Sequence, residues 1–231
     1  MIATPQFVFL HLHKSGGTFV NECLFKHFSQ AILLGYHLPR RLIPPPYVNL
    51  PVIGLVRNPW SYYVSWFSYQ SARPQANALF RILSRDKQLD FKDTISNMLR
   101  LGDDIELLGA VVQALPRLYT NAGLNLPGHA LAGIADSGMG FYSYLYQYMY
   151  GDDNELLRLG RMENLRTDLL NMLNEIGVPV DQALRDHILN EAPVNVSSHA
   201  YYAEYYDDEL RDLVAERDAL ILARHGYHFG G

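Results

Sequence analysis

The sequence contains a single cysteine, Cys23, among its 231 residues. No internal disulfide can therefore form, which fits a reducing cytoplasm, and we expect a cytoplasmic location. Cys23 falls on the apolar face of a predicted helix, so we expect it to be a core residue. No apolar run approaches the ~20 residues that a membrane span needs, and no basic region precedes the first short strand. We expect neither a membrane span nor a signal peptide.

An excess of positive charge is also absent, since the formal net charge is −5. A general nucleic-acid surface needs a basic patch, so we expect no nucleic-acid partner, although a local basic pocket for a small anion remains open. The His and Cys spacings match no zinc template, so we expect no metal. No repeat and no linker divides the chain. Its length suits one domain over residues 1–231, with an insertion of helices and loops around 71–160.

Two common nucleotide-binding signatures are missing as well. The Walker pattern places its lysine after the glycines, whereas Lys14 here comes before Gly16 and Gly17. An ordinary ATP or GTP loop therefore fits badly. No Gly-x-Gly-x-x-Gly follows a predicted strand, so a dinucleotide-binding fold is not indicated either.

The strongest positive signal is the stretch from Phe7 to Thr18. An apolar run alternates with His11 and His13, as in a strand near its end. Lys14-Ser15-Gly16-Gly17-Thr18 follows, and apolar residues then recur at helical spacing. A glycine turn between a strand and a helix N-terminus lets backbone N–H groups approach an anion, and a lysine adds charge. The alternative is a tightly packed turn with a solvated lysine.

A second strand-to-helix junction also begins with a cation. Residues 51–56 predict a strand buried on both faces, and Arg57-Asn58-Pro59 leads into a helix. Ser65 lies eight residues beyond Arg57, about two helical turns further on. Arg57 and Ser65 can share a ligand only if the helix runs alongside it. The alternative is an arginine paired with a nearby carboxylate and a solvated serine.

Together the two junctions resemble those of sulfotransferases that use 3′-phosphoadenosine 5′-phosphosulfate (PAPS). Lys14-Ser15-Gly16-Gly17-Thr18 resembles the 5′-phosphosulfate loop, and Arg57-Asn58-Pro59 with Ser65 resembles the 3′-phosphate motif Arg-Asp/Asn-Pro-x-x-Arg-x-x-Ser. Within this family the chain is similar to the bacterial carbohydrate-type branch, which is heparan/chondroitin sulfotransferase-like. The branch's loop often reads Pro-Lys-Thr-Gly-Gly-Thr.

The resemblance implies a P-loop-like α/β fold, with a central, mostly parallel sheet flanked by helices. It implies PAPS as sulfuryl donor, no metal, and an acceptor hydroxyl on a glycan or small molecule. The 5′-phosphosulfate would be held by Lys14, Ser15, Gly16, Gly17 and Thr18. Lys14 would also neutralise charge on the bridging oxygen, and Arg57 with Ser65 would hold the 3′-phosphate.

A general base is also implied by the resemblance. Gly35-Tyr36-His37-Leu38-Pro39 is similar to a Gly-His-x-Pro segment whose histidine takes the acceptor proton, with one residue inserted. A histidine near its usual pKa can do this at neutral pH, so His37 is our candidate and His13 its rival. Two residues depart from the family pattern. His13 stands where proline is usual, and Tyr62 replaces the second arginine of the 3′ motif.

The remaining segments carry weaker signals. Asp90 is expected to cap a helix, and residues 121–140 read as a long loop or lid. From Phe141 to Tyr150 every second residue is tyrosine, which suggests a strand but leaves a helix open. These tyrosines either pack against the core or contact a sugar or phenolic acceptor. Ser197, in an Asn-x-Ser segment similar to a family loop over the nucleotide, either touches PAPS or starts the next helix.

Two other functions remain open at this point. A P-loop kinase would also transfer an anionic group, but it needs Mg²⁺ and a lysine placed after the glycines. A non-catalytic nucleotide-binding protein is the alternative that the two departures from the family pattern suggest. The sequence does not indicate an oligomeric state.

Overall fold

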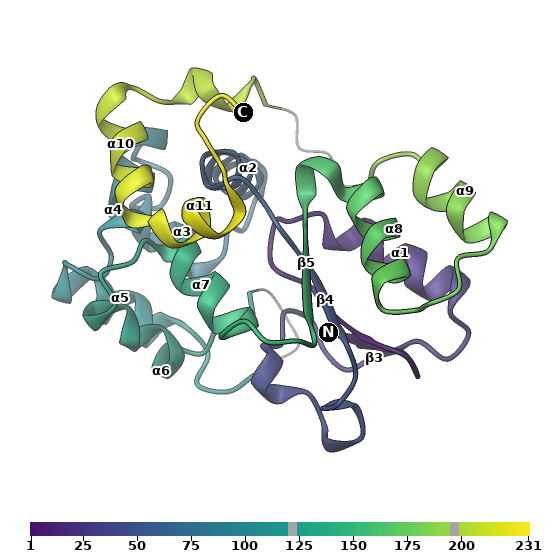
Figure 1. Cartoon of the computed structure of the whole chain (residues 1–231). Helices are drawn as coiled ribbons and strands as arrows, with labels where there is room; N and C mark the ends of the chain where they lie inside the picture. Colours follow the sequence, from purple (N-terminus) through teal and green to yellow (C-terminus); the bar gives the residue numbers. More distant parts are fainter. Residues whose placement is uncertain (120–123, 195–198) are drawn as a thin grey trace. The chain divides into compact units, whose positions relative to one another are not determined.

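The computed structural model describes residues 1–119, 124–194 and 199–231. The chain divides into two compact units (Figure 1). The first contains Met1–Arg57 and the segment that begins at Met149, and the second contains Asn58–Tyr148 and the segment that ends at Gly231. The organisation as one sulfotransferase domain stays a prediction.

The first unit is built on a five-stranded sheet. Its strands are β1 (Ile2–Ala3), β2 (Val8–Leu10), β3 (Ile32–Leu33), β4 (Val52–Val56) and β5 (Leu157–Arg161). Its helices are α1 (Gly17–His27), α8 (Leu165–Glu175) and α9 (Gln182–Asn190), with 3₁₀ turns at Arg40–Leu42, Pro45–Tyr47 and Met162–Asn164. The strand order is β3-β1-β2-β4-β5. The pairs β2–β4 and β4–β5 are parallel, whereas β1 is antiparallel to both β2 and β3.

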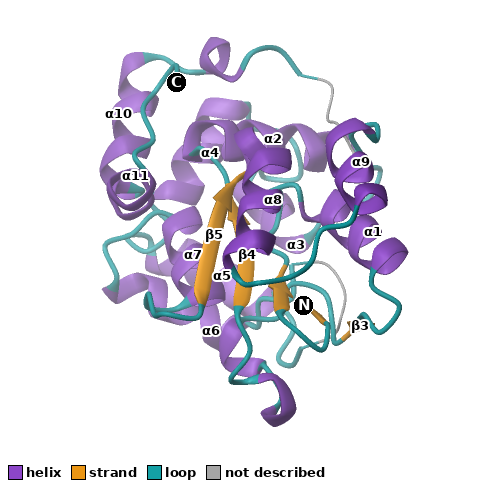
Figure 2. Cartoon of the chain, turned by 45° about the vertical axis from the view of Figure 1, so that its right-hand side comes forward, coloured by secondary structure: helices purple, strands orange, loops and turns teal. Residues whose placement is uncertain are grey.

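The helices α1, α8 and α9 lie side by side in this unit and bury their apolar faces against the sheet (Figures 1 and 2). The shared core includes Phe9, Val20, Leu55 and Leu173, each of which is almost fully buried. Burial of one such side chain contributes about 1.5–3 kcal/mol. Cys23 lies in the same core, as predicted. The predicted α/β fold, with a central sheet flanked by helices, is confirmed, and the sheet is mixed.

The second unit is helical among its described residues. Its elements are α2 (Pro59–Ala72), α3 (Ala78–Leu83), α4 (Phe91–Leu99), α5 (Ile105–Ala114), α6 (Gly128–Leu131), α10 (Asp208–Arg217) and α11 (Ala219–His225), with 3₁₀ turns at Ala132–Asp136 and Tyr202–Tyr205. Asp90 caps α4 by accepting a hydrogen bond from the Asp93 N–H at 2.9 Å, which confirms that prediction. The expectation of a long loop is wrong for residues 128–136, which are helical. Among the described residues, no helix combines the length and the apolar character that crossing a membrane would require.

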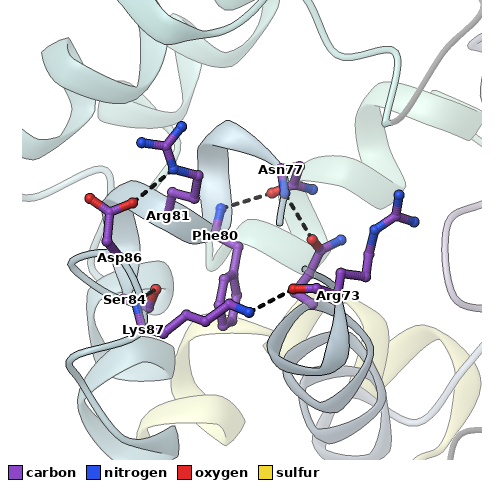
Figure 3. Close-up of polar contacts among 8 residues, drawn as sticks. Arg73, Asn77, Phe80, Arg81, Ser84, Asp86 and Lys87 are labelled. Atoms are coloured by element: carbon purple, nitrogen blue, oxygen red, sulfur yellow. Dashed lines mark hydrogen bonds and ion pairs between the residues drawn. The ribbon is translucent and has the colours of Figure 1, made fainter. Parts of the chain in front are cut away.

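Side-chain caps also order the turn between α2 and α3, as Figure 3 shows. The Asn77 side chain accepts a hydrogen bond from the Phe80 N–H at 2.8 Å, while the Asn77 N–H donates to Gln70 Oε1 at 3.0 Å. Lys87 Nζ donates to the Arg73 carbonyl at 2.6 Å. These bonds satisfy backbone groups that the helix ends leave without partners.

The tyrosine-rich segment is helix α7 (Phe141–Tyr150), so a strand is the wrong interpretation. Tyrosines at every second position include the set at i, i+4 and i+8, which is also one face of a helix. Tyr142, Tyr146 and Tyr150 form that set, and each is fully buried. Tyr142 stacks on Tyr62 with ring centroids 3.7 Å apart. The packing interpretation of these tyrosines is therefore confirmed.

Within the second unit, a buried carboxylate accepts a hydrogen bond from a backbone N–H in the first turn of α7. Asp218 is fully buried and accepts hydrogen bonds from the Tyr63 hydroxyl at 2.7 Å and from the Ser143 N–H at 2.8 Å. Burial raises the pKa of Asp218 to about 6, while these two hydrogen bonds act in the opposite direction. The folded protein therefore binds this proton more tightly than the unfolded chain does.

We predict that Asp218 makes the protein less stable as pH rises from about 4 to about 6, with no further loss above that range. The raised pKa corresponds to about 3 kcal/mol over this interval. Asp218→Asn removes the titration, so this fall in the free energy of unfolding should disappear from urea titrations at a series of pH values. A variant that shows the same fall as the parent protein would contradict this assignment of the carboxylate.

Candidate functional site

The two junctions singled out in the sequence meet at one edge of the sheet in the first unit. Strands β2 and β4 are parallel neighbours with Leu10 opposite Gly54, so the residues that follow both strands emerge at the same edge. Arg57 Nη1 donates a hydrogen bond to the Lys14 carbonyl oxygen at 3.2 Å. At the end of β5, Arg161 lies in register with Val56, so a third strand end at this edge also carries a cationic residue.

A tight turn leads from β2 into α1. The Ser15 N–H donates to the Leu12 carbonyl at 3.4 Å, and the buried Ser15 hydroxyl lies 3.5 Å from the His13 carbonyl. Lys14 has φ +60° and Gly16 has φ +79°, both in the left-handed region. That conformation costs a glycine little but strains a lysine. Strain of this kind persists only where surrounding contacts impose it, and it is common at functional sites.

The second glycine of the loop is required by a close approach. A Cβ atom at Gly17 would lie 2.1 Å from Cδ2 of the His11 ring, which no real contact allows. A Cβ atom at Gly16 would lie 2.5 Å from the Leu165 side chain. The His11 ring therefore packs directly on the first residue of α1, and it can do so only because that residue has no side chain.

The N-termini of the two helices that follow these junctions differ. Helix α1 is preceded by Gly16, which has no side chain to cap it, and its first turn, which includes Thr18, contains no acidic residue. Helix α2 begins at Pro59, and Asn58 caps it by accepting from the N–H groups of Trp60 and Ser61 at 3.1 and 3.4 Å. Uncapped N–H groups and the helix dipole favour an anion, so α1 is the better anion site.

His37 contacts the same loop from the segment after β3. Its Nδ1 lies 2.8 Å from the His11 carbonyl oxygen, and since a carbonyl can only accept, Nδ1 carries the hydrogen. The lone pair is therefore on Nε2. Burial lowers the pKa of His37 to about 4, against the effect of its hydrogen bond to His11. The imidazole is neutral at pH 7, as a proton acceptor must be.

Two further imidazole rings surround His37. The ring centroids of His11 and His13 lie 4.6 and 5.3 Å from that of His37, both in edge-to-face arrangements. Asn21, on α1, donates from Nδ2 to His11 Nδ1 at 3.2 Å. Sequence reasoning identified neither His11 nor Asn21 as part of this arrangement. The only signal was spacing, because Asn21 lies one helical turn after Gly17 and faces the same side of α1.

The two junctions also bring two cations close together, Lys14 in the loop and Arg57 after β4. Burial and, after it, the nearby charge of Arg57 together lower the pKa of Lys14 to about 8. Keeping two like charges in a partly buried place is unfavourable, and an anion bound between them would relieve this. The electrostatics therefore favour a ligand with several negative charges.

Other residues named from the sequence lie elsewhere or are not described. Ser65 is buried on α2 in the second unit, so its pairing with Arg57 stays a prediction. Tyr62 is buried against Tyr142 and is a packing residue of that unit. Ser197 lies outside the described residues. Across residues 1–119, 124–194 and 199–231, no group of three or more His, Cys, Asp or Glu side chains is arranged to hold a metal ion.

Comparison with known proteins adds a similarity of fold. No family model matches the sequence, and no curated protein matches it either. Among solved structures, the chain is similar to the mouse sulfotransferase SULT7A1 complexed with PAP, with a TM-score of 0.50 and 12% sequence identity. The similarity covers 97% of this chain and 90% of that one. At this identity the likeness is one of fold.

The contact between Gly17 and His11 can be tested by a double-mutant cycle. We predict that Gly17→Ala destabilises the protein by about 1–3 kcal/mol, because the new methyl group overlaps the His11 ring. In a His11→Ala background the same change should be neutral or should stabilise by up to about 1 kcal/mol, since alanine is the better helix former. Urea unfolding of the four proteins measures the coupling, and an equal cost of Gly17→Ala in both backgrounds would contradict it.

Proposed function

We propose that this protein is a sulfotransferase that moves a sulfuryl group from PAPS to an acceptor hydroxyl. The observation that carries the proposal is the hydrogen bond from Arg57 Nη1 to the Lys14 carbonyl at 3.2 Å. It brings the loop that resembles a 5′-phosphosulfate site next to the first residue of the motif that resembles a 3′-phosphate site. The fold similarity to a sulfotransferase complexed with PAP supports the same reading.

The residues present fit a doubly phosphorylated nucleotide. In our proposal the backbone N–H groups of residues 15–18 hold the 5′-phosphate, because no side chain caps the start of α1. Lys14 supplies charge at the same loop. Arg57, with Ser65, holds the 3′-phosphate that distinguishes this nucleotide from ADP. When bound, PAPS supplies the sulfuryl group.

His37 is the proposed general base. Its Nδ1–H is held by the His11 carbonyl, which leaves Nε2 as the atom that takes the acceptor proton. Because the ring is neutral at pH 7, no prior deprotonation is needed. His13 remains the rival base, since its ring centroid lies 5.3 Å from that of His37.

For the acceptor we propose a hydroxyl of a glycan or of another small molecule, as in the carbohydrate-type branch that the loop resembles. Tyr36, next to the proposed base, is 43% exposed, and its ring centroid lies 6.4 Å from that of His37. An exposed aromatic face with a hydroxyl tip suits a sugar ring. The cytoplasmic location stays a prediction from the single cysteine.

We predict that adenosine 3′,5′-bisphosphate raises the thermal unfolding temperature more than ADP or ATP does, because only the bisphosphate has a 3′-phosphate for Arg57. Arg57→Ala should abolish the advantage of the bisphosphate over ADP while leaving ADP binding in place. Arg158→Ala is the matched control, since Arg158 forms an exposed pair with Glu175 at 3.4 Å elsewhere in the first unit.

Three outcomes, two from this thermal-shift experiment and one from a transfer assay, would count against the proposal. If the Arg57→Ala protein still prefers the bisphosphate over ADP, Arg57 does not hold the 3′-phosphate. A preference for ATP that depends on Mg²⁺ would instead favour a kinase. Tight bisphosphate binding without sulfate transfer from PAPS to any member of a broad acceptor panel would indicate a non-catalytic nucleotide-binding protein.

A separate prediction concerns His37. His37→Asn should lower the rate of sulfate transfer by about 10²–10⁴-fold, because the base is lost. Bisphosphate stabilisation should not change, since asparagine tolerates the φ of +50° and its amide can still donate to the His11 carbonyl. The exposed His129 provides the control variant His129→Asn. Undiminished transfer in His37→Asn would move the role of base to another group.

A further inference from the structure

His13 has a buried nitrogen that the proposed chemistry does not explain. It immediately precedes Lys14 in the turn, and its Nδ1 atom is buried without a hydrogen-bond partner. A buried polar atom left unpaired costs about 1–3 kcal/mol, and such atoms in folded proteins call for an explanation. The atom lies in the loop that we propose to bind phosphate.

The surroundings of the ring keep it neutral. Burial comes first among the causes that lower the pKa of His13 well below its usual range, followed by His37, Lys14 and His11. Lys14 is itself close to Arg57, and the buried α-amino group of Met1 also acts on His11 and His37. The groups named here, all among the described residues, are thus positive or potentially positive.

A bound nucleotide would reverse this balance. Each phosphate monoester carries about −1.5 to −2 charges at neutral pH, so a bisphosphate brings about −3 to −4 to the place where Arg57 meets the loop that contains Lys14. Opposite charge within about 4–6 Å favours the protonated form of an imidazole. His13 is then placed to become a further cation beside Lys14.

We propose that His13 is a nucleotide-binding residue that takes up one proton from solvent when the bisphosphate nucleotide binds, so that its imidazolium joins Lys14 and Arg57 in holding the phosphates. The inference rests on the proposed function, because it needs that nucleotide. We assign the proton to His13 because the neighbouring rings of His11 and His37 are less suited to accept a proton. A proton on His11 Nδ1 would displace the hydrogen bond from Asn21. His37, for its part, has to stay neutral to serve as a base.

Proton uptake can be measured directly by titration calorimetry with adenosine 3′,5′-bisphosphate near pH 7, in buffers of different ionisation enthalpy. We expect uptake of about one proton, and an affinity that tightens by up to about tenfold for each unit that pH falls within the range where His13 titrates. Lys14, with its pKa at about 8, would add a small uptake, and the phosphates would release a similarly small amount. Both contributions are the same in the wild-type protein and in a variant of His13, so the difference in proton uptake between the two proteins reports on His13 alone.

The informative variant is His13→Gln, which keeps a polar side chain that cannot be protonated. It should bind the bisphosphate more weakly and without the extra proton. His27→Gln is the matched control, because His27 also has a buried ring nitrogen without a partner but lies in the last turn of α1. His37→Asn tests the competing site, and it should keep the uptake. Nitrogen NMR shifts of the wild-type imidazoles provide a readout that needs no variant, and His13 should change from neutral to cationic on binding.

Each possible result decides between the two proposals. Bisphosphate binding without proton uptake, or uptake that survives in His13→Gln, overturns the role of His13 and leaves the sulfotransferase proposal standing. Proton uptake that disappears in His37→Asn but not in His13→Gln assigns the proton to His37, and this also overturns the role proposed for His13. If the bisphosphate does not bind at all, both proposals fail together.

Discussion

The parallel pairing of β2 with β4 is the constraint on which the candidate site depends. Parallel neighbours end at the same edge of a sheet, and the register that places Leu10 opposite Gly54 fixes how far apart their ends lie. In this register Arg57 Nη1 reaches the Lys14 carbonyl. The same bond fixes the carbonyl of Lys14, a residue in the left-handed region with φ +60°. Two segments 43 residues apart in sequence therefore form one cationic surface.

Strand β4 is held in this position by an aromatic residue from the end of α7. The Tyr150 ring packs on Gly54, where a Cβ atom would lie 2.5 Å from Tyr150 Cε1, and its hydroxyl donates to the Leu55 carbonyl at 2.8 Å. A glycine in the middle of a strand normally weakens it, and here it makes room for the ring. The buried Tyr150 thereby supports the strand that presents Arg57.

Local patterns in the sequence were enough to predict features that depend on neighbouring residues. These are the apolar strand that ends at Val56, Pro59 at the start of α2, and the Asp90 cap of α4. The tyrosine segment was ambiguous because tyrosines at every second position fit one face of a strand, while every second one of them, four residues apart, fits one face of a helix. What sequence could not reveal are contacts made across the fold. The ring of His11 over Gly17, the bond between His37 and the His11 carbonyl, and the lowered pKa values all arise from tertiary packing.

Three kinds of unfavourable feature occur together at this edge of the sheet. Lys14 and His37 have left-handed backbone conformations, Lys14 is held near the like charge of Arg57, and His13 Nδ1 is buried without a partner. Each feature costs of order 1–3 kcal/mol, and a core of well-packed strands and helices has to offset them. A turn that served only to connect β2 with α1 would need neither the charge repulsion nor the unpaired nitrogen. A polyanionic ligand would relieve the charge repulsion and satisfy the unpaired nitrogen, so the combination of these two costs beside one loop is an argument for binding.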